Sequence, residues 1–220
     1  MRMRRGMRMI EIIPSPGTED KNFDSIQYKV RLVIGLVDWV EIDILDNTLY
    51  QNATYNNWES FRAFKDEIHL AGHLMVSDPA KYVGPLVING FKRLIADVEG
   101  DTVRDFTKKC RERGVEAGVA LNGPASLELV EPYVDEIDTV LLMTINAGFS
   151  GQLFLPAVLP KIKALKELYP HMPIEVDGGI DKQTAPQVFA NGATRLVSTS
   201  YLYQKNSRRI AEAIAELKGV

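Results

Sequence analysis

Eight short apolar segments, each followed by a polar or glycine-containing loop and then a stretch with helical spacing, predict an α/β fold: a single-domain (β/α)8 TIM barrel. The chain has 220 residues, which suits one barrel of roughly 200–250 residues. Strands that alternate with helices pair in parallel through right-handed crossovers. The segments are Ile10–Ile13, Trp39–Ile44, His69–Val76, Arg93–Ala96, Glu116–Leu121, Thr139–Met143, Ile174–Val176 and Arg195–Val197.

The intervening stretches have the spacing and the ends of helices. Asp181 and Ser200 are suitable N-caps, and Gly114 follows a predicted helix. An open doubly wound sheet is an alternative, but no Gly-x-Gly-x-x-Gly motif follows the first strand. Apolar residues recur at three- and four-residue steps in two stretches: Val158, Leu159, Ile162, Leu165 and Leu168, and Ile210, Ile214 and Leu217.

Charge and composition argue against several functions. The 26 Lys and Arg residues nearly balance the 29 Asp and Glu residues, giving a net charge of −3, and no basic stripe suggests nucleic acid as a partner. No run of about 18 apolar residues predicts a membrane span. The single cysteine, Cys110, cannot form an internal disulfide, so we expect a cytoplasmic location and a structural role for this residue.

The first eight residues, MRMRRGMR, are basic, but no apolar signal segment follows them, because Glu11 interrupts the apolar run and Pro14 stops it. We expect residues 1–8 to be a disordered leader and residues 9–220 to form the barrel.

Polar side chains follow the predicted strands at their carboxyl ends, where the loops of a TIM barrel form the active site. Polar residues are common at strand ends, but three carboxylates and a histidine at one barrel mouth are less expected without a function. The residues at these ends are Ser15, Asp43, Asp46, His73, Asp97, Asn122, Met143, Asn146, Asp177 and Ser198–Ser200.

Strand alternation places several of these groups inside the barrel. Glu41 and Asp43 share one face of the second strand, while Ile42 and Ile44 take the face that packs against helices. The same reasoning directs four other side chains inward: Glu175 and Asp177 from the seventh strand, and His73 and Met75 from the third.

Several carboxylates in a dry mouth repel one another unless a cation joins them or some are protonated. Carboxylates with a histidine suit Zn²⁺, Mn²⁺ or Fe²⁺ better than Ca²⁺. The alternative is pairing with Lys or Arg, but neither lies on the inward face of these three strands. The pattern therefore favours a metal site.

An anion site is predicted beside it. Gly178 and Gly179 after the seventh strand allow backbone N–H groups to approach an anion, and Ser198-Thr199-Ser200 supplies hydroxyls at a helix start. TIM barrels often bind phosphate at these two loops. A tight βα turn is the alternative explanation of the two glycines.

Several segments match the motifs of one family in order and spacing. They are Pro14-Ser15 for a PS pair, Asp38–Asp46 for DWIHVDVMD, Asn52 and Thr54 for a downstream Asn and Thr, His73-Leu74-Met75-Val76 with Pro79 for HLMV, Leu141–Gln152 for a loop containing MTVNPGFGGQ, and Asp177-Gly178-Gly179-Ile180 for DGGI. On these residues the chain from Met9 onward resembles the ribulose-phosphate 3-epimerases.

The resemblance implies an isomerase that inverts C3 of D-ribulose 5-phosphate to give D-xylulose 5-phosphate. Asp43 and Asp177 would be the acid/base pair on opposite faces of the substrate, with a metal stabilising the enediolate between the two proton transfers. The implied metal ligands are Glu41, Asp43, His73 and Asp177, and the expected ion is Zn²⁺, with Mn²⁺, Fe²⁺ or Co²⁺ as alternatives.

The resemblance also implies partners: a small sugar phosphate and, since the family forms dimers and larger rings, further copies of the chain. The residues expected to bind the substrate are Ser15, His73, Met75, Met143, Gly148, Phe149, Ser150, Gly151, Gly178, Gly179, Thr199 and Ser200.

The sequence departs from the family at Glu41, where the family has a histidine ligand, and at Thr199, where it has the glycine of a phosphate-binding Gly-Ser pair. Ala147 and Ser150 replace Pro and Gly of the substrate loop, and Asp97 stands where His is frequent. Two alternatives follow: an epimerase of a related ketose phosphate such as allulose 6-phosphate, or a degenerate barrel that binds a ligand without turnover. A phosphosugar decarboxylase is disfavoured, because its Asp-x-Lys-x-x-Asp motif has no match at Asp43–Asp46.

Overall fold

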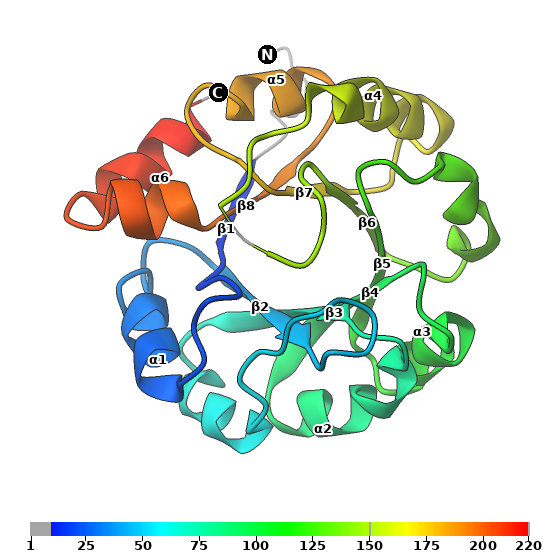
Figure 1. Cartoon of the computed structure of the whole chain (residues 1–220), viewed down its shortest axis with the longest axis horizontal. Helices are drawn as coiled ribbons and strands as arrows, with labels where there is room; N and C mark the ends of the chain where they lie inside the picture. The colour runs from blue at the N-terminus through cyan, green and yellow to red at the C-terminus, as the bar shows by residue number, and fades with distance from the viewer. Residues whose placement is uncertain (1–9, 150, 220) are drawn as a thin grey trace, which may run out of the picture.

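A computed structural model describes residues 10–149 and 151–219 of the chain. Its eight parallel strands pair in the order β1-β8-β7-β6-β5-β4-β3-β2, and β1 and β2, at the ends of this order, lie side by side (Figure 1). The sheet is therefore a nearly closed barrel, and the predicted TIM-barrel fold is confirmed. The strands are β1 Glu11–Pro14, β2 Trp39–Leu45, β3 His69–Met75, β4 Phe91–Asp97, β5 Glu116–Leu121, β6 Thr139–Met143, β7 Ile174–Asp177 and β8 Arg195–Ser198.

Helices surround the barrel on its outside (Figure 1). They bury one apolar face against the sheet, as Val103, Phe106 and Cys110 do in α3. Asp181 accepts hydrogen bonds from the N–H groups of Gln183 and Thr184, but it lies in the turn before the helix, and the N-cap of α5 is Thr184 instead of the predicted Asp181. The α-helices are α1 Phe23–Arg31, α2 Val83–Ile88, α3 Val103–Glu112, α4 Leu159–Leu168, α5 Ala185–Ala190 and α6 Ile210–Lys218.

Two parts of the repeating pattern differ from the prediction. The 3-10 helix η1, Trp58–Phe64, follows β2, and the short 3-10 helices η3 Leu127–Leu129 and η4 Glu131–Tyr133 follow β5. Pro132 lies within η4 and provides no N–H for a longer helix. After β8 a short π-helix, η6 Tyr201–Lys205, starts with Ser200 at its N-cap as predicted, but in the described part of the chain the Ser200 side chain makes no capping hydrogen bond to it.

The apolar residues form two cores. The larger lies between the strands and the outer helices. The smaller lies inside the barrel and contains Ile95, Ala120, Leu141, Met143 and Ile145, which come from β4, β5, β6 and the loop after β6. Glu41 and Asp43 of β2 and Asp177 of β7 also face the interior. The barrel interior therefore contains an apolar cluster from β4, β5 and β6 and an acidic cluster from β2 and β7.

Strand register fixes which side chains meet at the mouth. Asp43 of β2 lies beside His73 of β3, and Met143 of β6 lies beside Asp177 of β7. Among the described residues, no helix is long and apolar enough to cross a membrane. The predicted leader, residues 1–8, lies outside the described residues, as does Ser150.

Candidate metal and substrate site

Four side chains predicted as metal ligands meet at the carboxyl ends of β2, β3 and β7. Glu41, Asp43, His73 and Asp177 each offer one ligand atom, and these atoms all lie within 4.8 Å of one another. Glu41 and His73 are fully buried and Asp43 nearly so, whereas Asp177 is partly exposed. The group therefore reaches from the barrel interior to its mouth.

Several buried polar atoms of this group have no hydrogen-bond partner, and they indicate whether the group fits a metal. Within residues 10–149 and 151–219, no hydrogen-bond partner satisfies either carboxylate oxygen of Glu41, Oδ1 of Asp43 or Nδ1 of His73, and all four atoms are buried. Buried polar atoms without partners are costly and rare. Carboxylate oxygens and an imidazole nitrogen are donors that divalent transition metals accept. The four residues thus form a possible binding group for one divalent cation.

Crowding of the carboxylates changes their protonation when no cation is bound. Burial, followed by the negative charge of Asp43, raises the pKa of Asp177 to about 8. Burial and the charge of Glu175 likewise raise the pKa of Glu41. Burial alone would lower the pKa of His73, but its contacts with Asp43 and Asp97 raise it. The site therefore retains protons unless a cation replaces them.

Hydroxyl groups hold Asp43 and the end of β2 in place. The Ser15 hydroxyl donates to Asp43 Oδ2 at 3.0 Å. The Thr54 hydroxyl donates to the Asp43 carbonyl at 2.9 Å and accepts the Leu45 N–H at 3.0 Å. Asp43 Oδ1 is left facing the His73 ring, 3.6 Å from Nδ1. Ser15, predicted to bind substrate, is placed to orient this carboxylate.

An arginine that the sequence analysis did not consider lies deeper in the barrel. Arg93 of β4 is 1% exposed and contacts Glu175 at 3.4 Å, Glu11 at 3.0 Å and Glu116 at 3.0 Å. The arginine-pairing alternative therefore holds for Glu175 but not for the four-residue group. The alternation of Arg93, Ile95 and Asp97 along β4 could have revealed its inward direction.

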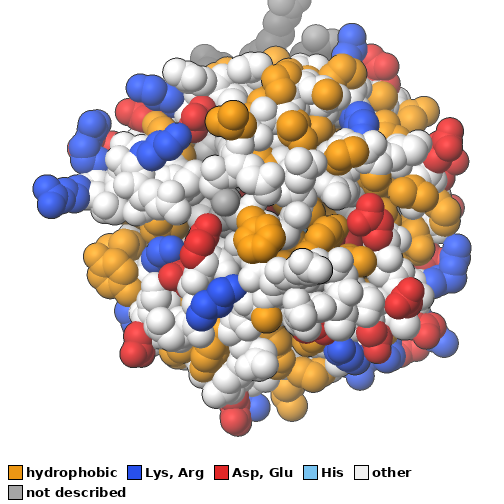
Figure 2. Space-filling view, in the orientation of Figure 1, with side chains coloured by type: hydrophobic (Ala, Val, Ile, Leu, Met, Phe, Trp, Pro, Cys, Tyr) orange, Lys and Arg blue, Asp and Glu red, His pale blue; other side chains and the backbone are white. Residues whose placement is uncertain are grey.

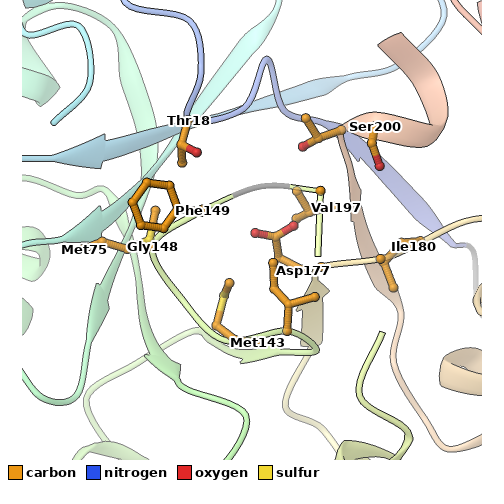
Figure 3. A pocket seen from close by; sticks show the side chains of 14 residues that line it. Thr18, Met75, Met143, Gly148, Phe149, Asp177, Ile180, Val197 and Ser200 are labelled. Atoms are coloured by element: carbon orange, nitrogen blue, oxygen red, sulfur yellow. The ribbon is translucent and has the colours of Figure 1, made fainter. Parts of the chain in front are cut away.

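A narrow cavity of about 30 Å³ adjoins the group and has Asp177 in its wall. Figure 3 shows the Asp177 carboxylate pointing into this space, with Met143 and Val197 on either side of it. Nine predicted substrate-binding residues line the cavity with Asp177: Met75, Met143, Gly148, Phe149, Gly151, Gly178, Gly179, Thr199 and Ser200. Thr18, Ile145, Ile180 and Val197 also line it and were not predicted.

The two glycines after β7 are required by their surroundings. Gly178 has φ +118°, and a Cβ there would lie 2.5 Å from the side chain of Ile145. Gly179 has φ +64°, and a Cβ there would lie 2.9 Å from the backbone nitrogen of Phe154. Both positions favour glycine on conformational grounds. Close packing against the loop after β6 is thus sufficient to explain the Gly-Gly pair.

The loop after β6 lies over the barrel interior (Figure 1). Asn52 donates to the Gly148 carbonyl at 2.8 Å, and Asn122 accepts the Ala147 N–H at 3.2 Å. Phe149 is 56% exposed at the cavity edge. Figure 2 shows hydrophobic side chains near the centre of this face and charged side chains mainly around its rim. The loop thus covers the cavity as a lid tied to neighbouring loops.

A TIM barrel with a carboxylate–histidine group and an adjoining cavity at the carboxyl ends of its strands has the build of a barrel enzyme. Three solved structures show the same fold. The 3-hexulose-6-phosphate synthase of Salmonella typhimurium has TM-score 0.74 at 13% identity, covering 96% of this chain and 97% of that one. The 3-keto-L-gulonate-6-phosphate decarboxylase of Vibrio cholerae has TM-score 0.72 at 14% identity, covering 97% and 98%. A mutant tryptophan synthase alpha-subunit of Pyrococcus furiosus has TM-score 0.75 at 14% identity, covering 97% and 100%.

Sequence comparison goes further than fold. The model of the ribulose-phosphate 3 epimerase family matches residues 19–203. The ribulose-phosphate 3-epimerase of Bacillus subtilis strain 168 is 35% identical over 96% of this chain and 99% of its own length. The cytoplasmic isoform of the enzyme from Oryza sativa subsp. japonica is 33% identical over 86% of each chain, and the Synechocystis enzyme is 30% identical over 94% and 93%. The chain belongs to the ribulose-phosphate 3 epimerase family, and it is an isomerase with epimerase activity.

Proposed function

We propose that the chain is a metal-dependent epimerase that inverts C3 of D-ribulose 5-phosphate to give D-xylulose 5-phosphate, the reaction for which its relatives are named. The observation that carries this proposal is the meeting of Glu41, Asp43, His73 and Asp177 within 4.8 Å at one barrel mouth. Two of these carboxylates, Asp43 and Asp177, come from β2 and β7. They can therefore approach a substrate from different sides.

Inversion at C3 requires removal of a proton from one face and delivery of a proton to the other. One of Asp43 and Asp177 takes the proton and the other supplies one, and the roles exchange in the reverse direction. Burial and the charge of Asp43 raise the pKa of Asp177 to about 8 without a cation, which supports a role for this carboxyl in holding a proton near neutral pH. Ser15 keeps Asp43 oriented through its 3.0 Å hydrogen bond.

The four-residue group would hold a divalent cation, and we propose Zn²⁺, with Mn²⁺, Fe²⁺ or Co²⁺ as alternatives. When bound, the ion supplies the positive charge that stabilises the negative oxygen formed when C3 loses its proton. Met75 and Met143, each 2% exposed, border the same space with apolar surface. They exclude water from the carbon that changes configuration.

The phosphate of the substrate is proposed to lie beside Gly178, Gly179, Thr199 and Ser200, which share the cavity with Asp177. Thr199 has a β-branched side chain where a glycine would allow closer backbone approach. We further propose a cytoplasmic location, from the lone buried Cys110 and the cytoplasmic isoform among the relatives, and a homo-oligomer, which the family resemblance implies. Size-exclusion chromatography with light scattering measures the assembly.

Replacing either carboxylate tests the two-carboxylate mechanism. Asp43→Asn and Asp177→Asn should each lower kcat for ribulose 5-phosphate by at least about 10²–10⁴-fold, the usual contribution of one general acid or base. Circular dichroism should show an intact barrel. A coupled assay for xylulose 5-phosphate, run in parallel with allulose 6-phosphate as substrate, measures both activity and substrate choice. Full activity of Asp177→Asn would contradict the mechanism.

A further inference from the structure

Asp97 of β4 lies directly behind the metal group, against the far side of the His73 ring. Its Oδ1 is 3.2 Å from His73 Nε2, while Nδ1 on the other side of the ring faces Asp43 Oδ1 at 3.6 Å. Asp97 is 2% exposed and His73 is fully buried. The ring is thus held between the Asp97 carboxylate, which does not line the cavity, and the group that would hold the cation.

We propose that Asp97 is a positioning residue that fixes both the orientation and the tautomer of His73. A carboxylate can only accept, so the imidazole proton is placed on Nε2, and the lone pair of Nδ1 is directed at the site. A metal-binding histidine gains basicity and a fixed ring from such a partner. This inference rests on the metal site of the proposed function.

The surroundings of Asp97 give it little freedom to turn away. The Gly100 N–H donates to its carbonyl at 3.0 Å, and the next N–H, of Val98, donates to the Ala120 carbonyl at 2.9 Å. Tyr50 also lies near it, since burial and the charge of Asp97 raise the pKa of the Tyr50 hydroxyl, which donates to Glu99 at 3.2 Å. A buried carboxylate on a backbone held in this way can keep a ring in one orientation, which a solvent-exposed carboxylate could not.

The test measures Zn²⁺ affinity of the metal-stripped full chain by competition with a chromophoric chelator. Asp97→Ala should weaken Zn²⁺ binding about 10- to 100-fold, and Asp97→Asn, which keeps the size and one acceptor oxygen, should weaken it less. Glu99→Gln is the matched control: it removes a nearby charge without touching His73, and its affinity should equal that of the wild type.

Nitrogen-15 NMR of the imidazole rings gives a second readout that a general loss of stability would not produce. The chain has only 3 histidines, so the His73 signals can be assigned with a His73→Asn variant. In Zn²⁺-loaded wild type, Nε2 should carry the proton, and this signal should broaden through faster exchange in Asp97→Ala.

Unchanged Zn²⁺ affinity in folded Asp97→Ala, or an equal loss in Glu99→Gln, would overturn the positioning role while leaving the metal site standing. Failure of the wild type itself to bind Zn²⁺ would overturn both proposals. The two failures are therefore distinguished by the wild-type measurement.

Discussion

Glu41 is the residue that most distinguishes this site from the pattern of its family, which has a histidine there. Both carboxylate oxygens of Glu41 are buried and have no hydrogen-bond partner among the described residues, which supports the ligand role proposed for it. Three carboxylates and one imidazole make a harder and more negative donor set than two of each. Carboxylate oxygens favour Mn²⁺ more than imidazole nitrogens do, and imidazole suits Zn²⁺.

Glu41→His should therefore shift metal preference toward Zn²⁺. We expect the ratio of the Mn²⁺ to the Zn²⁺ dissociation constant to rise in the variant, measured by chelator competition for each ion. Glu99→Gln serves again as the control for loss of one negative charge. An unchanged ratio, with both constants as in the wild type, would show that Glu41 does not ligate the ion.

The contacts of Arg93 could not be predicted from the sequence pattern. The alternation along β2, β3 and β7 was sufficient to predict that Glu41, Asp43, His73 and Asp177 face inward, and the structure brings them together. Arg93 and Asp97 lie on β4 with the same alternation, but their partners Glu175 and His73 are distant in sequence. Contacts of this kind depend on the register between strands, which the sequence pattern does not contain.

At the scale of elements, the loop after β6 depends on its neighbours for its position. Asn52, in the loop after β2, donates to the Gly148 carbonyl at 2.8 Å, and its Oδ1 accepts from Lys21 Nζ at 2.7 Å. One side chain thus connects the loops after β1, β2 and β6. The family's downstream Asn, matched at this position in the sequence, has a structural task here.

Asn52→Ala should loosen the lid. We expect KM for ribulose 5-phosphate to rise about fivefold, since a hydrogen bond contributes about 1 kcal/mol, with a smaller change in kcat. Hydrogen exchange of the 146–149 amides should become faster. Gln51→Ala, at the exposed neighbouring position, is the control, and equal kinetics in both variants would argue against the lid role of Asn52.

Some of the predicted helices are confirmed, and others form shorter 3-10 helices. Long amphipathic repeats, such as those of α4 and α6, appear in the structure as expected. The segments after β2 and β5 form 3-10 helices instead. In the second segment, Pro132 has no N–H to continue a helix from Leu127. After β8 a short π-helix begins at Ser200, the predicted helix start, although the Ser200 side chain makes no capping hydrogen bond among the described residues.

Across the whole molecule, charge is distributed in layers along the barrel interior. Near the amino ends of the strands, Arg93 and Arg195 are paired with Glu11 and Glu116, and Arg93 also with Glu175. Near the carboxyl ends, the carboxylates of Glu41, Asp43 and Asp177 have His73 as their only basic contact within the described ranges. The lower layer is neutralised by arginine, and the upper layer needs protons or a cation.

This imbalance predicts how the stability of the metal-free protein depends on pH. The folded pKa values of Glu41, Asp177 and His73 are all raised, so the folded chain binds more protons than the unfolded chain. Their stabilising contribution is complete at low pH and is lost as the pH rises through the folded values, which reach about 8 at Asp177.

We therefore expect the gain in Tm on adding Zn²⁺ to the metal-stripped protein to increase from pH 5 to pH 8, because the ion replaces protons that are lost in this range. Differential scanning calorimetry at fixed ionic strength measures the gain. Asp177→Asn, which cannot titrate at this position, should show a flatter dependence. A gain that falls with pH would contradict the layered charge distribution.

We propose that one cation and two carboxylates at this mouth exchange the C3 proton of a ketose phosphate. This exchange is tested most directly by NMR of ribulose 5-phosphate incubated in D₂O with protein whose metal content has been measured. We expect about one divalent ion per chain and deuterium at C3 of the xylulose 5-phosphate formed. Metal-loaded protein that leaves C3 fully protonated would contradict it.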